Sequence, residues 1–535
     1  MLPSFDAGTE ALQPVRRGRT SSALVWNLIL SAFSMLVIFA IMYGIMPRRL
    51  SEKQMGVFSM LWTVWLGLIL ICQSGLQGAL LRYVPELEAK GSYRQMTRLY
   101  YAILASQLGF WVLCAVALYA GRRLDIAGLG LLPLVPLLIT LISVPFRLVI
   151  NSQLAVLQAF RDIKWMAIAQ VLTRTIALVL IFILVAHVLP GAEGKIIACF
   201  VVLAATDLLT SVLTQRTMTR HFRQASVGDA TVPVRRLAWY AGPLIIRSVM
   251  TFIEQGQATP LLMGILGGEA LAGYYQLAYF FPSRVVEFVP VAIWPVVLAS
   301  FAEAYTRDRR YLAAGLQLYT KLLFAMLLPL AVGGALFGDR VIQVVSGPRY
   351  ELAFLPCQVF FALIALHIFS APLSVCLHVV EKTWLFMVTA AVGAIANLGV
   401  VILIVPLFTA PTVKLLIAVV AVAVDWVLVM AIQYRYVKRL APGFRPPWSA
   451  LGRTVAGCLV IVPAVAMTYL VQDWTWLHLV AVTALCGGLT VLGYRVFRVI
   501  DAATLKIILS SRLPLKRAVA AVLASPRVVA ETQKL

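Results

Sequence analysis

Charged side chains are scarce in this chain, and their scarcity excludes an ordinary soluble protein. Only 13% of the 535 residues are Asp, Glu, Lys or Arg, whereas 61% are hydrophobic and the mean hydropathy is +0.91. A soluble domain is nearer half apolar and a quarter charged. The composition therefore predicts a polytopic membrane protein.

Acidic residues are the scarcer of the two charge types, with 22 Asp and Glu against 45 Lys and Arg. Most of the basic residues fall in loops on one side of the predicted spans, which predicts that both termini are cytoplasmic. Basic blocks such as "QRTMTRHFR" and "YRYVKRL" are interpreted as topology determinants that face anionic lipid headgroups, not as nucleic-acid sites. The amphipathic stretch "TLKIILSSRLPLKRAVAAVLA" is expected to lie on the cytoplasmic membrane surface.

Patterns typical of disulfides, metal sites and catalysis are missing. The 7 cysteines lie in or beside apolar segments without any Cys-x-x-Cys, so we interpret them as packing residues. His187, His367 and His378 have no partner at metal-ligand spacing. The longest outer connection, "FGDRVIQVVSGPRYELA", has no paired carboxylates or histidines, which argues against an enzyme. We therefore expect no catalytic residue and no metal site.

Long apolar runs, by contrast, fill the chain. The first, Ala23–Met46, exceeds the apolar region of a signal peptide and has no cleavage site, so it is predicted to be a retained span. About fourteen segments can each cross the ~30 Å hydrocarbon core as a helix, so the predicted fold is all-α. They are roughly 23–46, 56–80, 100–120, 130–156, 165–187, 196–214, 238–265, 270–301, 317–336, 352–379, 384–406, 413–433, 454–471 and 477–497.

The chain also matches itself at a near-constant offset. "EKQMGVFSM" aligns with "EALAGYYQL", with Gly56 over Gly273, and "ATDLLTSVLTQ" aligns with "VAVDWVLVMAIQ", with Asp207 over Asp425. Such a repeat predicts two six-helix lobes related by a pseudo-two-fold axis along the membrane normal, with a central cavity between them. The predicted parts are a cytoplasmic segment (1–22), an N-lobe with helices 1–6 (23–225), a cytoplasmic linker (226–236), a C-lobe with helices 7–12 (237–440), helices 13 and 14 (441–499) and a basic cytoplasmic tail (500–535).

Two stretches carry a family resemblance. "LSEKQMGVFSMLWTVWLGLILICQSGLQGALLRYVPE" resembles the opening of the bacterial polysaccharide transporters, and "LGGEALAGYYQLAYFFPSRVVEFVPVAIWPVVLASFAE" resembles the start of their second lobe. These transporters belong to the multidrug/oligosaccharidyl-lipid/polysaccharide flippase superfamily. The resemblance covers about residues 20–440, and the helix pair at 454–497 fits the family's fourteen-span version.

The resemblance implies a flippase that moves polyprenyl-diphosphate-linked oligosaccharide across the bacterial inner membrane for O-antigen or exopolysaccharide synthesis. It implies action as a monomer, contact with membrane lipid, and a polysaccharide polymerase and export machinery as partners. Because the matching residues are glycines and apolar side chains, no binding-site residue is carried over from the family. The candidate site residues below come from this sequence alone.

Ionised side chains lie within several predicted spans. Each costs roughly 2.5–3.5 kcal/mol at a helix centre if it faces lipid. They are therefore expected to face the bundle interior, a water-filled cavity or one another. The residues are Arg147, Arg174, Asp207, Arg247, Glu254, Arg284, Glu287 and Asp425.

The four arginines are candidates for binding the substrate. Arg174 and Arg247 lie ~14 Å past the cytoplasmic start of their spans, Arg147 lies about as far from the cytoplasmic end of its span, and Arg284 lies near the middle of another. A guanidinium keeps its charge and matches phosphate oxygens, which suits a diphosphate headgroup. The alternative is structural pairing, for example of Arg284 with Glu287 three residues later on the same helix face.

The four acids are candidates for coupling transport to a proton or sodium gradient. Asp207 and Asp425 occupy equivalent positions in the two lobes and have a structural alternative, as partners of an arginine or acceptors at a helix cap. Glu254 is the preferred coupling candidate because it lies deeper than Arg247, although those two residues have a mutual ion pair as their alternative. In the repeat, Arg174 aligns with Gly393, so this charge belongs to one lobe only.

Two other functions stay open from the sequence. One is a cation-coupled multidrug exporter of the same superfamily, which we expect to have a more acidic or apolar cavity and twelve spans. The other is a polytopic membrane enzyme acting on lipid-linked sugars. Beyond a possible ion gradient, the sequence predicts no cofactor.

Overall fold

A computed structural model gives the fold over residues 33–499, with residues 501 and 505. The description leaves out 74–75, 161, 163, 224–227, 229–231, 286–296, 298–300, 302–308, 381–382 and 469–473. The predictions for the segment 1–22, for nearly all of the tail 500–535 and for Glu287 therefore lie outside the described residues.

The first half of the described chain is a series of helices joined by short connections. A helix over 33–39 continues into a π-helical turn and α2. The elements are η1 (Ala40–Ile45), α2 (Met46–Arg49), α3 (Glu52–Gln73), α4 (Leu76–Ala89), α5 (Tyr93–Arg123), η2 (Ile126–Leu131), α6 (Leu134–Ala159), α7 (Lys164–Ile183), η3 (Leu184–Val188) and α8 (Ala192–Phe222).

The second half is also a series of helices and ends in α16, α17 and α18. Residues 269–285 form a further helix between α10 and α12. The elements are α9 (Val234–Glu254), α10 (Thr259–Gly267), α12 (Arg309–Val345), η4 (Pro348–Ala353), α13 (Phe354–Val379), α14 (Thr383–Ile404), η5 (Val405–Leu407), α15 (Pro411–Leu440), α16 (Trp448–Leu459), α17 (Val462–Thr468) and α18 (Trp476–Val496).

The predicted all-α membrane fold is confirmed. Within the described residues, 10 helices are long and apolar enough to cross a membrane, and a helix pair bent by 41° over 348–379 would make 11. The other predicted spans are 23–46 and 270–301, which are described only in part, and 238–265, which is broken into α9 and α10. The described part of the chain contains no β-strand.

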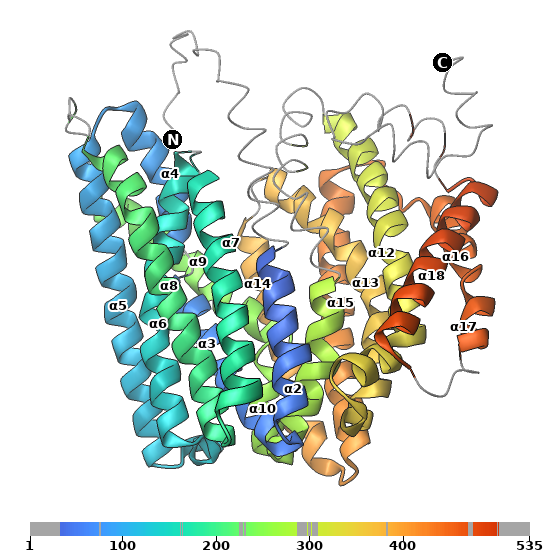
Figure 1. The fold of residues 1–535 in the computed structure, drawn as a ribbon. Coiled ribbons are helices and arrows are strands. Elements are labelled where there is room, and N and C mark those ends of the chain that lie inside the picture. Colours follow the sequence, from blue (N-terminus) through green and yellow to red (C-terminus); the bar gives the residue numbers. More distant parts are fainter. Residues whose placement is uncertain are drawn as a thin grey trace.

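The helices pack in two groups, with the last helices at one edge (Figure 1). In the first group α8 packs against both α6 and α7, and α6 also contacts α3 and α4. In the second, α15 packs against α13 and α14, and α12 packs against α13. Helices α16 and α18 pack against each other and against α12. Helix α9 lies between the groups because it contacts α14 as well as α3 and α4.

The two glycines that align in the repeat contact each other. A Cβ on Gly56 would overlap the carbonyl oxygen of Glu269, and a Cβ on Gly273 would lie 3.0 Å from the backbone nitrogen of Gly56. Only glycine permits so close an approach of two helix backbones. A contact between equivalent residues is what a two-fold relation of the lobes produces. We call this end of the molecule the α2–α3 end and the opposite one the α4–α5 end.

The two ends hold the lobes together by different contacts. At the α2–α3 end, the hydroxyl of Tyr350 donates to the carbonyl of Pro47 at 3.0 Å, and Tyr274 donates to the carboxylate of Glu52. At the α4–α5 end, Arg236 of α9 forms an exposed two-pronged ion pair with Glu86 of α4, at 3.1 and 3.2 Å. Buried hydrogen bonds therefore close one end, and a solvent-exposed ion pair joins the other.

The seventh predicted span is not one continuous helix. It breaks between α9 and α10, where Gly256 has a φ of +68°. A Cβ on Gly256 would lie 2.9 Å from the hydroxyl of Tyr275 and 3.0 Å from Cγ2 of Val422. Both the left-handed backbone and the crowding require glycine. The break places Glu254 at the last position of α9.

Candidate functional site

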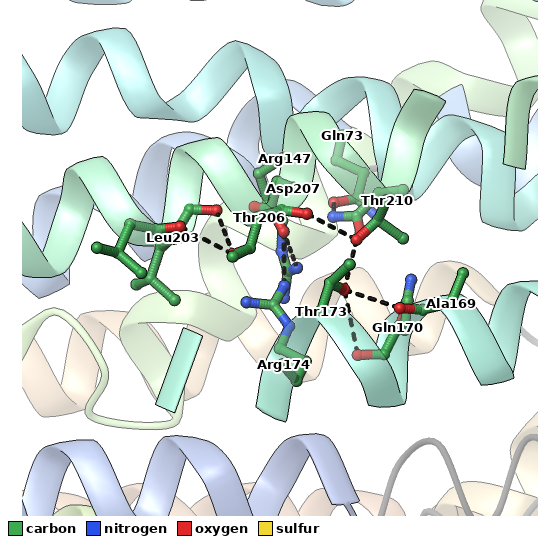
Figure 2. A network of polar contacts seen from close by, with 12 residues as sticks. Gln73, Arg147, Ala169, Gln170, Thr173, Arg174, Leu203, Thr206, Asp207 and Thr210 are labelled. Carbon is green, nitrogen blue, oxygen red and sulfur yellow. Dashed lines mark hydrogen bonds and ion pairs between the residues drawn. The ribbon is translucent and has the colours of Figure 1, made fainter. Parts of the chain in front are cut away.

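In the N-lobe, Asp207 binds two of the predicted arginines. Nη2 of Arg174 lies 2.7 Å and Nη1 of Arg147 lies 3.1 Å from Oδ1 of Asp207 (Figure 2). The three residues come from α7, α6 and α8, which pack together. The side chains of Asp207 and Arg174 are 2% and 6% exposed, and that of Arg147 is 18% exposed. We name these three residues the N-lobe cluster.

Threonine hydroxyls surround the N-lobe cluster and are themselves satisfied. The hydroxyls of Thr173 and Thr210 lie 2.6 Å apart, and Thr206 donates to the carbonyl of Val202 at 2.9 Å. Arg147 also lies over the ring of Trp65, 5.9 Å from its centroid. Asp207 thus has two positively charged partners in a buried place, and removing it would leave them uncompensated. The pattern matches a structural role for Arg174 and Asp207.

The polar contacts continue from the N-lobe cluster toward the α4–α5 end. Nε2 of Gln153 donates to Oγ of Ser211 at 2.9 Å and to Oε1 of Gln215 at 2.8 Å, and Thr214 donates to Gln153 at 2.9 Å. This network was not predicted from the sequence. The sequence does contain a signal for a polar helix face here. Threonines recur every fourth residue at 206, 210 and 214 of α8, which places them on one face of the helix.

In the C-lobe, Asp425 has no counterpart of these partners. It is 0% exposed on α15, and neither carboxylate oxygen has a hydrogen-bond partner among the described residues. A Cβ on Gly393 of α14 would overlap Oδ1 of Asp425 and would lie 3.0 Å from Cγ of Glu254. The two acids therefore approach the same point of α14. Two of the predicted coupling residues, far apart in the sequence, are brought together.

An unpaired amide lies one turn away from Gly393 on the same face of α14. Asn397 is 1% exposed, and neither its side-chain oxygen nor its nitrogen has a hydrogen-bond partner in the part of the chain that the structure describes. We name Glu254, Gly393, Asn397 and Asp425 the C-lobe site. It offers oxygen ligands but no group of three or more His, Cys, Asp or Glu among the described residues. Asn397 was not among the residues predicted for a site.

The remaining arginines lie against aromatic rings. The guanidinium of Arg247 lies 4.7 Å from the ring centroid of Phe386, which also stacks on His378 at 4.1 Å. Arg247 and Glu254 are both described, and no ion pair within 4.0 Å joins them. Arg284 lies 4.9 Å from the ring centroid of Phe280. Its hypothetical partner Glu287 lies outside the described residues.

Comparison with known proteins now places the chain. The pattern of a family described as polysaccharide biosynthesis protein matches residues 24–301, just over half of the chain. The chain belongs to this family. The resemblance seen in the two glycine-rich stretches is thereby confirmed. No curated protein matches the chain.

Several solved structures share the fold at low sequence identity. The lipid II flippase MurJ in an inward closed conformation is 14% identical, with a TM-score of 0.61 over 90% of this chain and 98% of that one. An inward-facing multidrug resistance MATE family transporter is 12% identical, with a TM-score of 0.56 over 82% and 98%. A MOP superfamily transporter from Pyrococcus furiosus is 14% identical, with a TM-score of 0.57 over 80% and 99%. At these identities the likeness establishes the fold.

Proposed function

We propose that this family member is a flippase that moves polyprenyl-diphosphate-linked oligosaccharide across the bacterial inner membrane, for cell-surface polysaccharide or exopolysaccharide. The two lobes alternate access to a basic central cavity. Family membership and a fold shared with a lipid II flippase over most of both chains support this proposal. It assigns no catalytic step to the chain. A polysaccharide polymerase and export machinery would use the product.

The surroundings of Arg247 are the observation that supports binding of a diphosphate headgroup. It lies within a predicted span, and no described carboxylate comes within ion-pair distance of it. Arg174 and Arg147, by contrast, already bind Asp207. A guanidinium held over an aromatic ring keeps its edge donors available for phosphate oxygens. Arg247 is therefore the first ligand of the diphosphate, and Arg284 is the second candidate.

The C-lobe site supplies the coupling step in this proposal. Two carboxylates this close and away from water cannot both stay ionised unless a cation lies between them. A proton or a sodium ion therefore binds at Glu254 and Asp425, and Asn397 offers a further oxygen. Because Glu254 ends α9 beside the break before α10, cation binding there can bias how α9 sits between the lobes.

The predicted topology supports an inward-facing starting state. With cytoplasmic termini, the α2–α3 end is the outer one, and its glycine contact and buried hydrogen bonds keep the outer side closed. Opening outward then requires separation of Gly56 from Gly273. Opening inward requires the exposed pair of Arg236 and Glu86 to part.

The test follows lipid-linked oligosaccharide in a strain that lacks the gene. Wild-type protein should place the oligosaccharide on the outer leaflet, and Arg247→Ala should leave it on the inner leaflet although the protein inserts. Arg247→Lys keeps the charge and should retain part of the transport, whereas Arg435→Ala, an exposed arginine of α15, is the matched control. Wild-type export by Arg247→Ala would remove Arg247 from the substrate site.

The acidic C-lobe site also fits a second candidate, a cation-coupled multidrug exporter. The phenotype of a deletion strain distinguishes the two functions. A flippase deletion strain loses surface polysaccharide and keeps its drug tolerance. An exporter deletion strain loses drug tolerance and keeps its polysaccharide.

A further inference from the structure

An apolar cavity lies beside the first span, away from the N-lobe cluster and the C-lobe site. Its volume is about 370 Å³. Phe39 and Gly44 line it from the first span, Phe182 and Ala186 from α7 and η3, and Val345 from the end of α12. It therefore lies where the first span meets both groups of helices, because η1 contacts α7 as well as α12.

Both walls of the cavity contain π-helical turns. Ala40–Ile45 forms η1 on one side, and Leu184–Val188 forms η3 on the other. Such turns are rare and are frequent at functional sites, because they widen the helix and redirect side chains. A Cβ added to Gly44 would meet no atom within 4 Å. The space beside Gly44 is thus open.

Cationic groups mark one end of the cavity. Arg48 donates to the carbonyls of Val344 and Val345 and lies 5.9 Å from the ring centroid of Trp476. Arg49 is exposed, and among the described residues its guanidinium has no hydrogen-bond or ion-pair partner. The ammonium of Lys195 lies nearby and donates to the carbonyl of Arg49 at 3.2 Å. One end of an otherwise apolar cavity thus carries several positive charges.

These charges lie where the spans end. Helix α2 stops at Arg49, the candidate membrane span Lys164–Val188 of the structure stops just after Ala186, and α18 begins at Trp476. Tryptophan and basic residues at that depth meet the headgroup region of a bilayer. The walls away from these charges are apolar, so a hydrocarbon chain is their natural occupant.

We propose that this cavity binds one acyl chain of an anionic phospholipid, with the lipid phosphate held by Arg49 beside Arg48 and Lys195. A cavity of about 370 Å³ fits one acyl chain better than the much longer polyprenyl tail. In the predicted topology this lipid belongs to the outer leaflet. Because the first span contacts both groups of helices here, a bound lipid stabilises the arrangement in which the α2–α3 end is closed.

The experiment measures lipids retained by the purified full-length protein in native mass spectrometry. Delipidated protein is mixed with phosphatidylglycerol or with phosphatidylcholine of the same acyl chains. Wild type should retain one phosphatidylglycerol with at least about tenfold preference, because the choline of phosphatidylcholine would bring a positive charge beside Arg49 and Lys195 whereas the glycerol headgroup brings none. Arg49→Gln should remove that preference, with Arg435→Gln, an exposed arginine at the α4–α5 end, as its matched control.

Two filling variants test the cavity itself. Gly44→Phe and Ala186→Phe fill it from opposite walls, and each should abolish retention of this lipid. Gly109→Phe is the control, because Gly109 lies exposed on α5 and a Cβ there meets no atom within 4 Å. Unchanged retention in both filling variants would overturn the proposal, and so would equal retention of the two lipids by wild type. Preferential retention of a polyprenyl phosphate over phosphatidylglycerol would overturn it as well.

Discussion

The same residue at equivalent positions of the two lobes has opposite surroundings. Asp207 of α8 accepts ion pairs from Arg174 and Arg147, whereas both carboxylate oxygens of Asp425 on α15 lack a partner among the described residues. A glycine at the position aligned with Arg174 accounts for part of this difference in surroundings. Where α7 carries Arg174, the aligned position of α14 is Gly393, beside Asp425. Both repeats therefore contain the aspartate, but only the first contains the arginines that pair with it.

This contrast separates a structural from a chemical use of one side chain. A buried acid between two arginines is fixed, because removing the acid leaves both guanidinium groups without a counter-charge. A buried acid beside a second acid has no permanent partner, so it requires a transient one. We therefore expect removal of Asp207 from the N-lobe cluster to change stability, and removal of either acid from the C-lobe site to change transport. The predictions below test this division from the largest expected effect to the smallest.

The largest effect is expected from Asp207→Ala. Removing this carboxylate leaves Arg174 and Arg147 buried without a counter-charge, which costs about 3–5 kcal/mol. The protein should lose its monodisperse peak, or its thermal midpoint should fall sharply, in fluorescence-detected size-exclusion chromatography. A thermal midpoint like that of wild type would show that the N-lobe cluster is not structural.

Asp425→Asn should leave stability intact and lower transport, in contrast to Asp207→Ala. It removes an unpaired buried charge, so the thermal midpoint should stay the same or rise, while oligosaccharide transport should fall at least tenfold because the coupling cation is lost. Glu254→Gln should behave in the same way. Transport by Asp425→Asn at the wild-type rate would contradict a role for this carboxylate.

Gly393→Ala tests the close approach of the two acids. The new methyl group would overlap Asp425 and crowd Glu254, and overpacking of this kind costs about 1–3 kcal/mol. Gly399→Ala is the matched control on the same helix, because a Cβ there meets no atom within 4 Å. That control should be neutral or gain up to about 1 kcal/mol. Equal thermal midpoints for the two variants would show that Gly393 is not confined.

Arg236→Ala should have the smallest effect. Its ion pair with Glu86 is exposed to solvent, and exposed pairs contribute little. We expect no measurable change in the thermal midpoint, which would show that burial is what makes the Asp207 pairs matter. A fall as large as that of Asp207→Ala would contradict this view of the two ends.

Much of the fold was predictable because each span carries its own signal. The lengths of the apolar segments were enough to predict most spans. The alignment of the repeat placed Gly56 and Gly273 at equivalent positions, and the structure brings these two glycines into contact. The break after Glu254 was not predicted, because the apolar residues on both sides of the short polar segment "EQGQATP" kept the whole stretch within one predicted span. The left-handed Gly256 and its contact with Tyr275 depend on tertiary packing.

The candidate site was predictable as a set of residues but not as pairs. Charged side chains within apolar spans are costly, so they stand out in the sequence without a structure. This applies to Asp207, Asp425, Arg174 and Glu254. Which acid meets which arginine depends on the lateral packing of α9 against α14 and of α7 against α8. Helical periodicity gives the face of a helix but not its neighbour. Asn397 was missed for the same reason, because an uncharged amide in a span gives no comparable signal.

The most direct test of the division between the lobes uses purified protein in liposomes. The rate of lipid-linked oligosaccharide movement is measured with and without an imposed proton gradient, and again with a sodium gradient. Wild type should move the lipid faster under one of these gradients, whereas Asp425→Asn should move it at one low rate under all conditions. Acceleration of the Asp425→Asn variant by the same gradient, to the same extent as wild type, would contradict a coupling site in the C-lobe.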